Sequence, residues 1–337
     1  MKITSATRPL LWPLVPAYRI ALALRELQLR TGLKTIRRLR WPVVSIGNLS
    51  TGGAGKTPLT IALAKALTAR GLHVDVLSRG YGRRSAVPLL VDVGGTARDF
   101  GDEPLLIARE AQVPVYVAAE RYEAGFLAEG TRASGQTSEG ARERISVHLL
   151  DDGFQHRQLA RDVDILLLSR RDLADRLLPA GNLREALHAA MRAHVIAIPT
   201  DEPEVEAQLR SIGWQGSVWR IRRQMEIPTL EGPVAAFCGI ARPNQFFKGL
   251  ETAGVKLAAR IAFADHHRYT AADLARIESA ARNAGATTLL TTEKDRIRLG
   301  SLASSLPVQT VLLRVEIEDE FAAVRWLRSR LERILRG

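Results

Sequence analysis

A glycine-rich stretch is the strongest chemical signal in the sequence. It follows an apolar run at 43–46, precedes a helix-like pattern at 58–70, and reads Ser50, Thr51, Gly52, Gly53, Ala54, Gly55, Lys56, Thr57. Backbone N–H groups of such a loop can surround phosphate oxygens, while the lysine reaches the outer phosphates and the threonine hydroxyl can bind Mg²⁺. Ser50 stands where the pattern G-x-x-x-x-G-K-[ST] usually has its first glycine. The stretch predicts a nucleotide-binding loop.

Two adjacent carboxylates follow another apolar run. Asp151 and Asp152 come directly after residues 145–150, which read as a buried strand. A nucleotide site needs an acidic partner for its metal, and Mg²⁺ is usually held by one or two carboxylates together with phosphates. We expect Thr57, Asp151 and Asp152 to form the Mg²⁺ site. The sequence leaves open which of the two aspartates contacts the metal directly. A solvated acidic turn is the alternative.

Two further clusters combine residues suited to proton transfer. The first is Gly101-Asp102-Glu103-Pro104 and the second is Asp265-His266-His267. Each has an ordinary explanation when taken alone, because Asp102 could cap a helix that begins at Pro104 and His266 could lie in a loop.

The elements that must position these clusters alternate between strands and helices. Such alternation predicts an α/β fold in which helices cover both faces of a parallel sheet. Residues 221–233 contain two prolines and no clear helical period, so a boundary is expected there, followed by a second α/β unit with strands near 234–238, 287–292 and 308–315. The predicted parts are a basic segment at 1–40, a P-loop-type parallel-sheet domain at 41–225 and a smaller Rossmann-like domain at 226–337. The polar stretch 130–144 is expected to be a surface loop or hairpin tip, and no function is assigned to it.

The positive charge of the chain is concentrated near its first residue. The whole sequence has 48 basic and 36 acidic residues, a net charge of +12, and residues 1–40 account for +8 of it. Apolar residues such as Trp12, Ile20 and Leu24 lie among these charges, which is typical of a helix that lies on a membrane surface. Arg19 and Arg25 interrupt the apolar run too early for a membrane crossing. A helix packed on the protein's own core is the alternative, and no cleavable signal peptide is expected.

The chain has a single cysteine in 337 residues, which indicates the redox state of the cellular compartment. Cys238 cannot close an intramolecular disulfide, so a reducing compartment fits the sequence and the cytoplasm is favoured.

The motifs, taken together and in order, resemble the tetraacyldisaccharide 4'-kinase family over residues 9–300. The matching stretches are Gly47-Asn48-Leu49 through Lys56-Thr57-Pro58, Leu77-Ser78-Arg79-Gly80-Tyr81-Gly82, Gly101-Asp102-Glu103-Pro104-Leu105, Leu150-Asp151-Asp152-Gly153-Phe154-Gln155-His156, Leu178-Pro179-Ala180-Gly181, Leu183-Arg184-Glu185, Phe237-Cys238-Gly239-Ile240, Asp265-His266-His267 and Thr292-Glu293-Lys294-Asp295. Many family members have proline where this chain has Asn182 and Ala186. This difference bears on the geometry of the local loop and not on the Arg184-Glu185 pair.

The resemblance implies an activity and a location. It implies transfer of the ATP γ-phosphate to the 4'-hydroxyl of tetraacyldisaccharide 1-phosphate, which forms lipid IVA in lipid A biosynthesis, with ATP and Mg²⁺ as cofactors. It also implies a peripheral, monotopic protein at the cytoplasmic face of the inner membrane. The expected partners are the lipid disaccharide and the membrane surface, without nucleic acid and without an obligate protein partner.

The resemblance also implies roles for single residues. Asp102 matches the proposed catalytic base and His266 its partner, and Lys56 is expected to neutralise phosphate charge. The other matching active-site positions are Asp151, Asp152, Glu103, Arg121, Gln155, Arg184 and Glu185. A carboxylate oriented by a histidine can accept the proton of a sugar hydroxyl, and guanidinium groups fit phosphate oxygens. We expect closure of the second domain over the first to bring His266 to Asp102.

Two other classes of protein fit the sequence less well. Nucleotide-switch or partitioning ATPases often have lysine directly before the Gly-Gly of the loop, where this chain has Thr51. A nucleic-acid-binding protein would need aromatic stacking platforms, but aromatic residues make up only 5% of the chain and no zinc or RNA-binding motif is recognisable.

Overall fold

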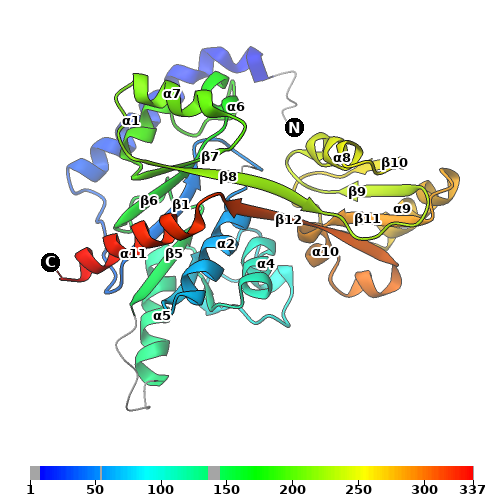
Figure 1. The fold of residues 1–337 in the computed structure, drawn as a ribbon, viewed down its shortest axis with the longest axis horizontal. Helices are drawn as coiled ribbons and strands as arrows, with labels where there is room; N and C mark the ends of the chain where they lie inside the picture. The colour runs from blue at the N-terminus through cyan, green and yellow to red at the C-terminus, as the bar shows by residue number, and fades with distance from the viewer. Residues whose placement is uncertain (1–7, 54, 136–144, 337) are drawn as a thin grey trace.

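The computed structural model describes residues 8–53, 55–135 and 145–336, and these form one continuous mixed β-sheet with helices on both faces (Figure 1). The strand order is β10-β9-β11-β12-β8-β7-β6-β1-β5-β2-β4-β3. The strands are β1 Val43–Asn48, β2 His73–Ser78, β3 Leu89–Leu90, β4 Val115–Val117, β5 Ser146–Asp151, β6 Val163–Leu167, β7 Val195–Pro199, β8 Ser217–Glu226, β9 Val234–Cys238, β10 Leu257–Ala262, β11 Thr288–Thr292 and β12 Val308–Ile317. The predicted α/β class is confirmed.

Helices connect most of these strands. The α-helices are α1 Val15–Arg30, α2 Lys56–Ala69, α3 Ala97–Phe100, α4 Asp102–Ala111, α5 Arg121–Gly135, α6 Arg170–Ala174, α7 Pro203–Ser211, α8 Pro243–Thr252, α9 Ala271–Asn283, α10 Glu293–Leu299 and α11 Glu320–Arg336. The 3₁₀ segments are η1 Arg8–Leu14, η2 Leu187–Arg192 and η3 Gly300–Ser305.

The first unit is built around β1, which lies between β5 and β6 in parallel pairing. All six residues of β1 are buried, since helices cover both faces of the sheet here. Parallel strands end at the same edge of a sheet, so the segments that follow β1 and β5 meet there. This edge carries the glycine-rich loop and the two adjacent aspartates.

The second unit consists of four parallel strands, β10, β9, β11 and β12. Side chains of β9 alternate between its faces, as expected for a strand. Val234 and Ala236 share a core with Phe246 of α8, whereas Ala235 and Phe237 pack into another core, which includes residues of α9. Helices therefore cover both faces of this part of the sheet as well.

Two long strands join the units. β12 pairs in parallel with β11 and antiparallel with β8, and β8 continues into the first unit through β7 (Figure 1). Residues 221–226, which begin the stretch where a boundary is expected, lie within β8. Helix α11 follows β12 and returns to the first unit, where Leu327 and Leu331 share a core with Leu63 of α2. The predicted domain boundary between residues 225 and 226 stays a prediction. Helix α11 lies after this boundary in the sequence but packs against the first unit.

Part of the stretch expected to be a loop is helical. Helix α5 continues to Gly135, so residues 130–135 belong to it. Residues 136–144 lie outside the described residues.

The basic segment forms η1 and α1, which lie along the outside of the first unit (Figure 1). One face of α1 contacts the body of the protein: the Tyr18 hydroxyl donates to the Arg184 carbonyl at 2.9 Å, and Arg25 donates to the Gln155 carbonyl. Ile20 and Leu24 are more than half exposed. Among the described residues, no helix combines the length and apolar content that a membrane crossing requires.

Candidate active site

The glycine-rich loop connects β1 to the N-terminus of α2. Gly52, Gly53 and Gly55 have φ angles of 76°, 49° and 90°, and Gly55 is the N-cap residue directly before α2. These positive angles favour glycine, because a Cβ atom would be strained there. The loop therefore turns so that the first N–H groups of α2 remain available to an anion. Ala54 lies outside the described residues.

Lys56 faces polar groups at the ends of β1 and β5. Its Nζ atom donates to Oδ1 of Asn48 at 2.9 Å and lies 3.4 Å from Oδ1 of Asp152. The side chain of Lys56 is 12% exposed. A nearly buried ammonium group beside the loop provides positive charge for a bound phosphate.

The two adjacent aspartates have different surroundings. Asp152 accepts hydrogen bonds from Nη1 of Arg184 at 3.0 and 2.9 Å. Burial raises the pKa of Asp152, but Lys56 and Arg184 lower it more, so that it lies below its usual value. Asp151 accepts from the Thr60 hydroxyl at 3.3 Å. Burial, followed by the charges of Glu103 and Asp152, raises the pKa of Asp151 to about 7. The negative charges of Glu103 and Asp152 together with burial thus outweigh the positive charges of Lys56 and Lys294 at Asp151.

Asp102 and His266 come from the two different units and meet at one point. Asp102 begins α4 directly after Gly101, whose φ is 91° and where a Cβ atom would lie 3.0 Å from Cα of Gly80. Nδ1 of His266 lies 3.2 Å from Oδ2 of Asp102, and the His266 ring lies 4.9 Å from that of Tyr81. The predicted pair is therefore within hydrogen-bonding distance. No expectation assigned Tyr81 to the site.

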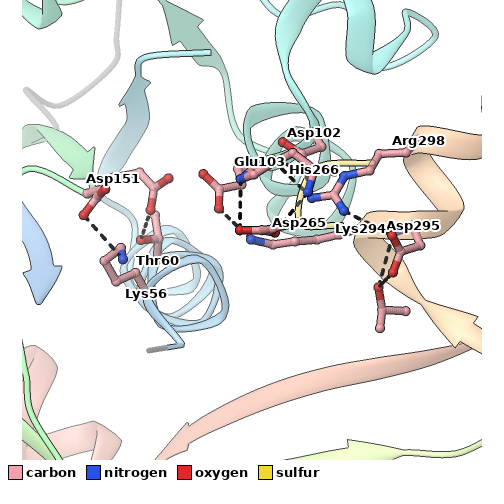
Figure 2. Close-up of polar contacts among 12 residues, drawn as sticks. Lys56, Thr60, Asp102, Glu103, Asp151, Asp265, His266, Lys294, Asp295 and Arg298 are labelled. Atoms are coloured by element: carbon pink, nitrogen blue, oxygen red, sulfur yellow. Dashed lines mark hydrogen bonds and ion pairs between the residues drawn. The ribbon is translucent and has the colours of Figure 1, made fainter. Parts of the chain in front are cut away.

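Helix α10 adds two cations to the carboxylates of α4 (Figure 2). Lys294 Nζ lies 2.6 Å from Oε1 of Glu103, and Arg298 Nε donates to Oδ2 of Asp102 at 2.7 Å. Burial raises the pKa of Asp102, but the His266 hydrogen bond and the charges of Arg298 and Lys294 lower it far below its usual value. Sequence reasoning missed both cations. The motif 292–295 included Lys294 without a role, and the i, i+4 spacing of the two cations on one helical face was the available signal.

Two of the described residues with unusual backbone angles belong to these clusters. Within 8–53, 55–135 and 145–336, the non-glycine residues with positive φ are Gln112, Asp152 and His266. Such conformations cost about 1–3 kcal/mol and are concentrated at functional sites. Their occurrence at Asp152 and His266 supports a functional role for both clusters.

The remaining predicted residues differ in their contacts. Nε of Arg121 is buried without a hydrogen-bond partner in the described part of the chain. Burial and the nearby Arg79 lower the pKa of Arg121 to about 10. Gln155 donates to the Asn48 carbonyl at 3.0 Å and accepts from Arg184 at 3.3 Å.

Glu185 is engaged elsewhere. Its Oε2 accepts from Arg192 at 2.7 Å, within the segment that follows Arg184. Glu185 is therefore already paired with a neighbouring cation.

The donor set next to the glycine loop fits a Mg²⁺ ion held together with phosphates. Within the residues that the structure describes, no group of three or more His, Cys, Asp and Glu side chains could hold a metal by itself. Mg²⁺ bound with a nucleotide needs only one or two carboxylates, because phosphates and water supply the other oxygens. The Thr57 hydroxyl and the carboxylates of Asp151 and Asp152 are such hard oxygen donors.

A large cavity adjoins the glycine loop on the side of the second unit. Its volume is about 1170 Å³, and its lining includes Thr51 and Gly52 of the loop, Asn182, and Arg242 and Lys248 at and within α8. A cavity of this size with basic side chains can accept the remainder of a ligand whose phosphates lie in the loop.

Comparisons with known proteins agree over almost the whole chain. The family model described as tetraacyldisaccharide-1-P 4'-kinase matches residues 7–332. Proteins named tetraacyldisaccharide 4'-kinase from Koribacter versatilis and Rhodopseudomonas palustris are 42% and 41% identical to the chain; the first match covers 95% of this chain and 98% of the relative, the second 86% and 85%. The crystal structure of the "apo" form of LpxK from Aquifex aeolicus in complex with ATP has a TM-score of 0.72 and 32% identity, with 96% of this chain and 99% of the other covered.

Proposed function

Since the chain belongs to the tetraacyldisaccharide 4'-kinase family, and is thus an ATP-dependent kinase that phosphorylates the lipid A precursor at its 4' position, we propose how its residues perform this reaction. The first unit acts as a P-loop kinase core, and the second acts as a smaller Rossmann-like domain that completes the site. The observation that carries the proposal is the meeting of Asp102 and His266 at 3.2 Å, with the neighbouring Glu103 close enough to Lys56 for the lysine charge to lower its pKa.

ATP binds with its phosphates at residues 50–57. The positive φ angles of the glycines and the open N-terminus of α2 suit phosphate oxygens. Lys56 neutralises charge on the outer phosphates, and the adjoining cavity accepts the nucleoside. Thr57, Asp151 and Asp152 would hold Mg²⁺, which would neutralise phosphate charge during transfer. The negative charges of Glu103 and Asp152 around Asp151, only partly offset by Lys56 and Lys294, support this assignment.

Asp102 accepts the proton of the acceptor hydroxyl as the new P–O bond forms. Its pKa lies far below neutrality, so the carboxylate is ionised under physiological conditions. A sugar hydroxyl is a poor nucleophile at neutral pH, and a positioned carboxylate contributes about 10²–10⁴-fold to such steps. His266 bonds to Asp102 from the second unit and orients it.

Basic and polar residues at the same edge of the sheet bind the acceptor. Arg121 has a buried guanidinium nitrogen without a described partner, which suits an anion such as the 1-phosphate of the acceptor. Arg184 donates to both Asp152 and Gln155, and these residues complete the polar surroundings of the acceptor together with Glu103. Glu185 contributes indirectly through its pairing with Arg192.

The protein works from the membrane surface. Exposed apolar side chains of η1 and α1 lie among the basic residues of the segment, and this combination suits the interface of a bilayer that contains anionic lipids. A lipid acceptor with four acyl chains also resides in a membrane. We therefore assign the chain to the cytoplasmic face of the inner membrane as a peripheral, monotopic protein.

Labelled ATP and a tetraacylated disaccharide 1-phosphate test the assignment of Asp102. We expect Asp102→Asn to lower acceptor-dependent label transfer by at least about 10²-fold and to leave ATP affinity nearly unchanged. Asp99→Asn is the matched control, because Asp99 is exposed and bonds only to Thr96 among the contacts described here. Full turnover in the Asp102 variant would exclude this residue as the base.

A further inference from the structure

A buried arginine contacts the proposed base from the second unit. The side chain of Arg298 is 6% exposed and that of Asp102 is 4% exposed. We propose that Arg298 is a positioning residue for phosphate transfer, because it holds the Asp102 carboxylate in one orientation. The inference rests on the role proposed above for Asp102.

The contacts with Asp102 are all made by one of its two oxygens. Nε of Arg298 donates to Oδ2 at 2.7 Å, and Nη2 of Arg298 donates to the same atom. Nδ1 of His266 lies 3.2 Å from Oδ2 as well. Oδ1 takes no part in these three contacts. A carboxylate held through Oδ2 from two directions presents Oδ1 to an incoming hydroxyl group.

Arg298 is itself fixed from the other side. Its Nη1 donates to Oδ1 of Asp295 at 3.1 Å and to the carbonyl of Gly239 at 2.5 Å. Asp295 is fully buried, and the same oxygen accepts from the Gly239 N–H and the Tyr269 hydroxyl, each at 3.0 Å. The guanidinium plane therefore has little freedom. Planar, multiply bonded guanidinium groups provide geometric specificity that an ammonium group cannot reproduce.

The surrounding charges favour the same role. Asp102 faces Arg298 and Lys294 on α10, His266 on the loop after β10, and Glu103 on its own helix, while Asp265 and Asp295 lie beyond these groups. Burial alone would favour the neutral acid, which cannot accept a proton. Arg298 is the cation in direct contact with Asp102 through two nitrogens, so its removal leaves a buried carboxylate with less compensation.

A low pKa makes Asp102 a weak base, and this is compatible with the reaction. Phosphoryl transfer depends mainly on the position of the reacting groups and on charge neutralisation, with little demand for a strong base. Arg298 thus lowers the basicity of Asp102, but it keeps the carboxylate ionised and correctly oriented. The competing explanation is an ion pair that only joins α10 to α4.

Three variants separate these explanations. Arg298→Gln removes both the positive charge and the planar set of guanidinium N–H donors. Arg298→Lys keeps the charge but lacks the planar donors. Arg296→Gln is a matched control on the same helix. Arg296 is exposed and donates to the Ala303 carbonyl. The assay is steady-state transfer from labelled ATP to a tetraacylated disaccharide 1-phosphate, with thermal unfolding and ATP affinity measured in parallel.

We expect Arg298→Gln to lower kcat by about 10²-fold and Arg298→Lys by about tenfold, with the KM for ATP unchanged in both. The Gln variant should also lose activity at a higher pH than the control on the acid side, because Asp102 then becomes protonated more readily. If the Gln variant does not fold, the Lys variant decides. The proposal would be overturned if folded Arg298→Lys had a kcat within twofold of the control. If Arg298→Gln also folds, its kcat would have to lie within twofold of the control as well.

A double-mutant cycle tests whether Arg298 acts through Asp102. In the Asp102→Asn background, Arg298→Lys should have almost no further effect on kcat, since the group that it positions is already lost. An additional tenfold loss there would show that Arg298 acts independently and would refute the inference. Failure of Asp102→Asn itself to lower turnover would instead refute the role of Asp102, so the two failures are distinguishable.

Discussion

The ammonium group of Lys294 lies 2.6 Å from Oε1 of Glu103, which links α10 of the second unit to α4 of the first. The two side chains are each less than one third exposed, so the pair lies largely away from solvent. Lys294 lowers the pKa of Glu103 and keeps it ionised. Arg298, one turn further along α10, contacts Asp102, which directly precedes Glu103, so two charged contacts join the two units.

Lys294→Met should weaken this link. A hydrogen bond between charged groups contributes about 2 kcal/mol, and the variant leaves Glu103 without its nearest cation. We expect the free energy of unfolding to fall by that amount in urea titrations and kcat/KM to fall by about tenfold. Lys256→Met, at an exposed position of the second unit, is the control. Equal stability and turnover in both variants would contradict the prediction.

His148 predicts how stability changes at alkaline pH. Its Nδ1 lies 2.5 Å from Oδ1 of Asp75 and its Nε2 lies 3.4 Å from Oε1 of Glu129. Burial lowers the pKa of His148, but the two carboxylates raise it more, to about 9. The protonated form is therefore favoured by folding, and its contribution is complete below about pH 6.5 and is lost as the pH rises through about 9.

His148→Gln should remove this dependence. Between pH 7 and pH 10 the free energy of unfolding of the unaltered protein should decrease by about 3 kcal/mol more than that of the variant. His188→Gln changes an exposed histidine and should behave like the unaltered protein. The same decrease in all three proteins would show that His148 is not the titrating group.

Tyr18 connects the basic helix to the site, because its hydroxyl donates to the Arg184 carbonyl at 2.9 Å. Tyr18→Phe removes about 1 kcal/mol of interaction and loosens α1 beside Arg184. We expect the KM for the lipid acceptor to rise about fivefold while the KM for ATP stays unchanged. Tyr122→Phe on α5 serves as the control. An equal rise in both KM values would show a general loss of structure instead.

The exposed row Ile20, Leu24 and Leu27 on α1 predicts binding to lipid vesicles. Changing all three residues to glutamine keeps helix propensity and removes apolar area. Sedimentation with vesicles that contain anionic phospholipids should then fall by at least about tenfold. Glutamine at the exposed residues Val87, Leu90 and Val93 is the matched change on another surface. Comparable loss in both triple variants would refute a specific role for α1.

The glycine-rich loop, the aspartates after β5 and most strands of both units could be predicted from the sequence. Each of these features is encoded locally, by an apolar run of strand length followed by residues with particular backbone or chemical properties. Strand β9 has the predicted bounds, and β1, β5, β11 and β12 differ from theirs by at most two residues at either end. The ordered motifs also indicated the family, which the comparisons confirm.

The path between the units required the tertiary structure. The stretch 221–233 suggests a boundary because it has two prolines and no clear helical period, yet residues 221–226 pair with β12, and Arg222 lies opposite Glu316. Opposite charges on neighbouring strands stabilise such a pair, but the partner strand lies far along the chain. The same holds for the contacts of Arg298 with Asp102 and of Lys294 with Glu103. Side chains on α4 and α10 meet only because β8 and β12 bring the two units together, and no local pattern encodes a pairing over that distance.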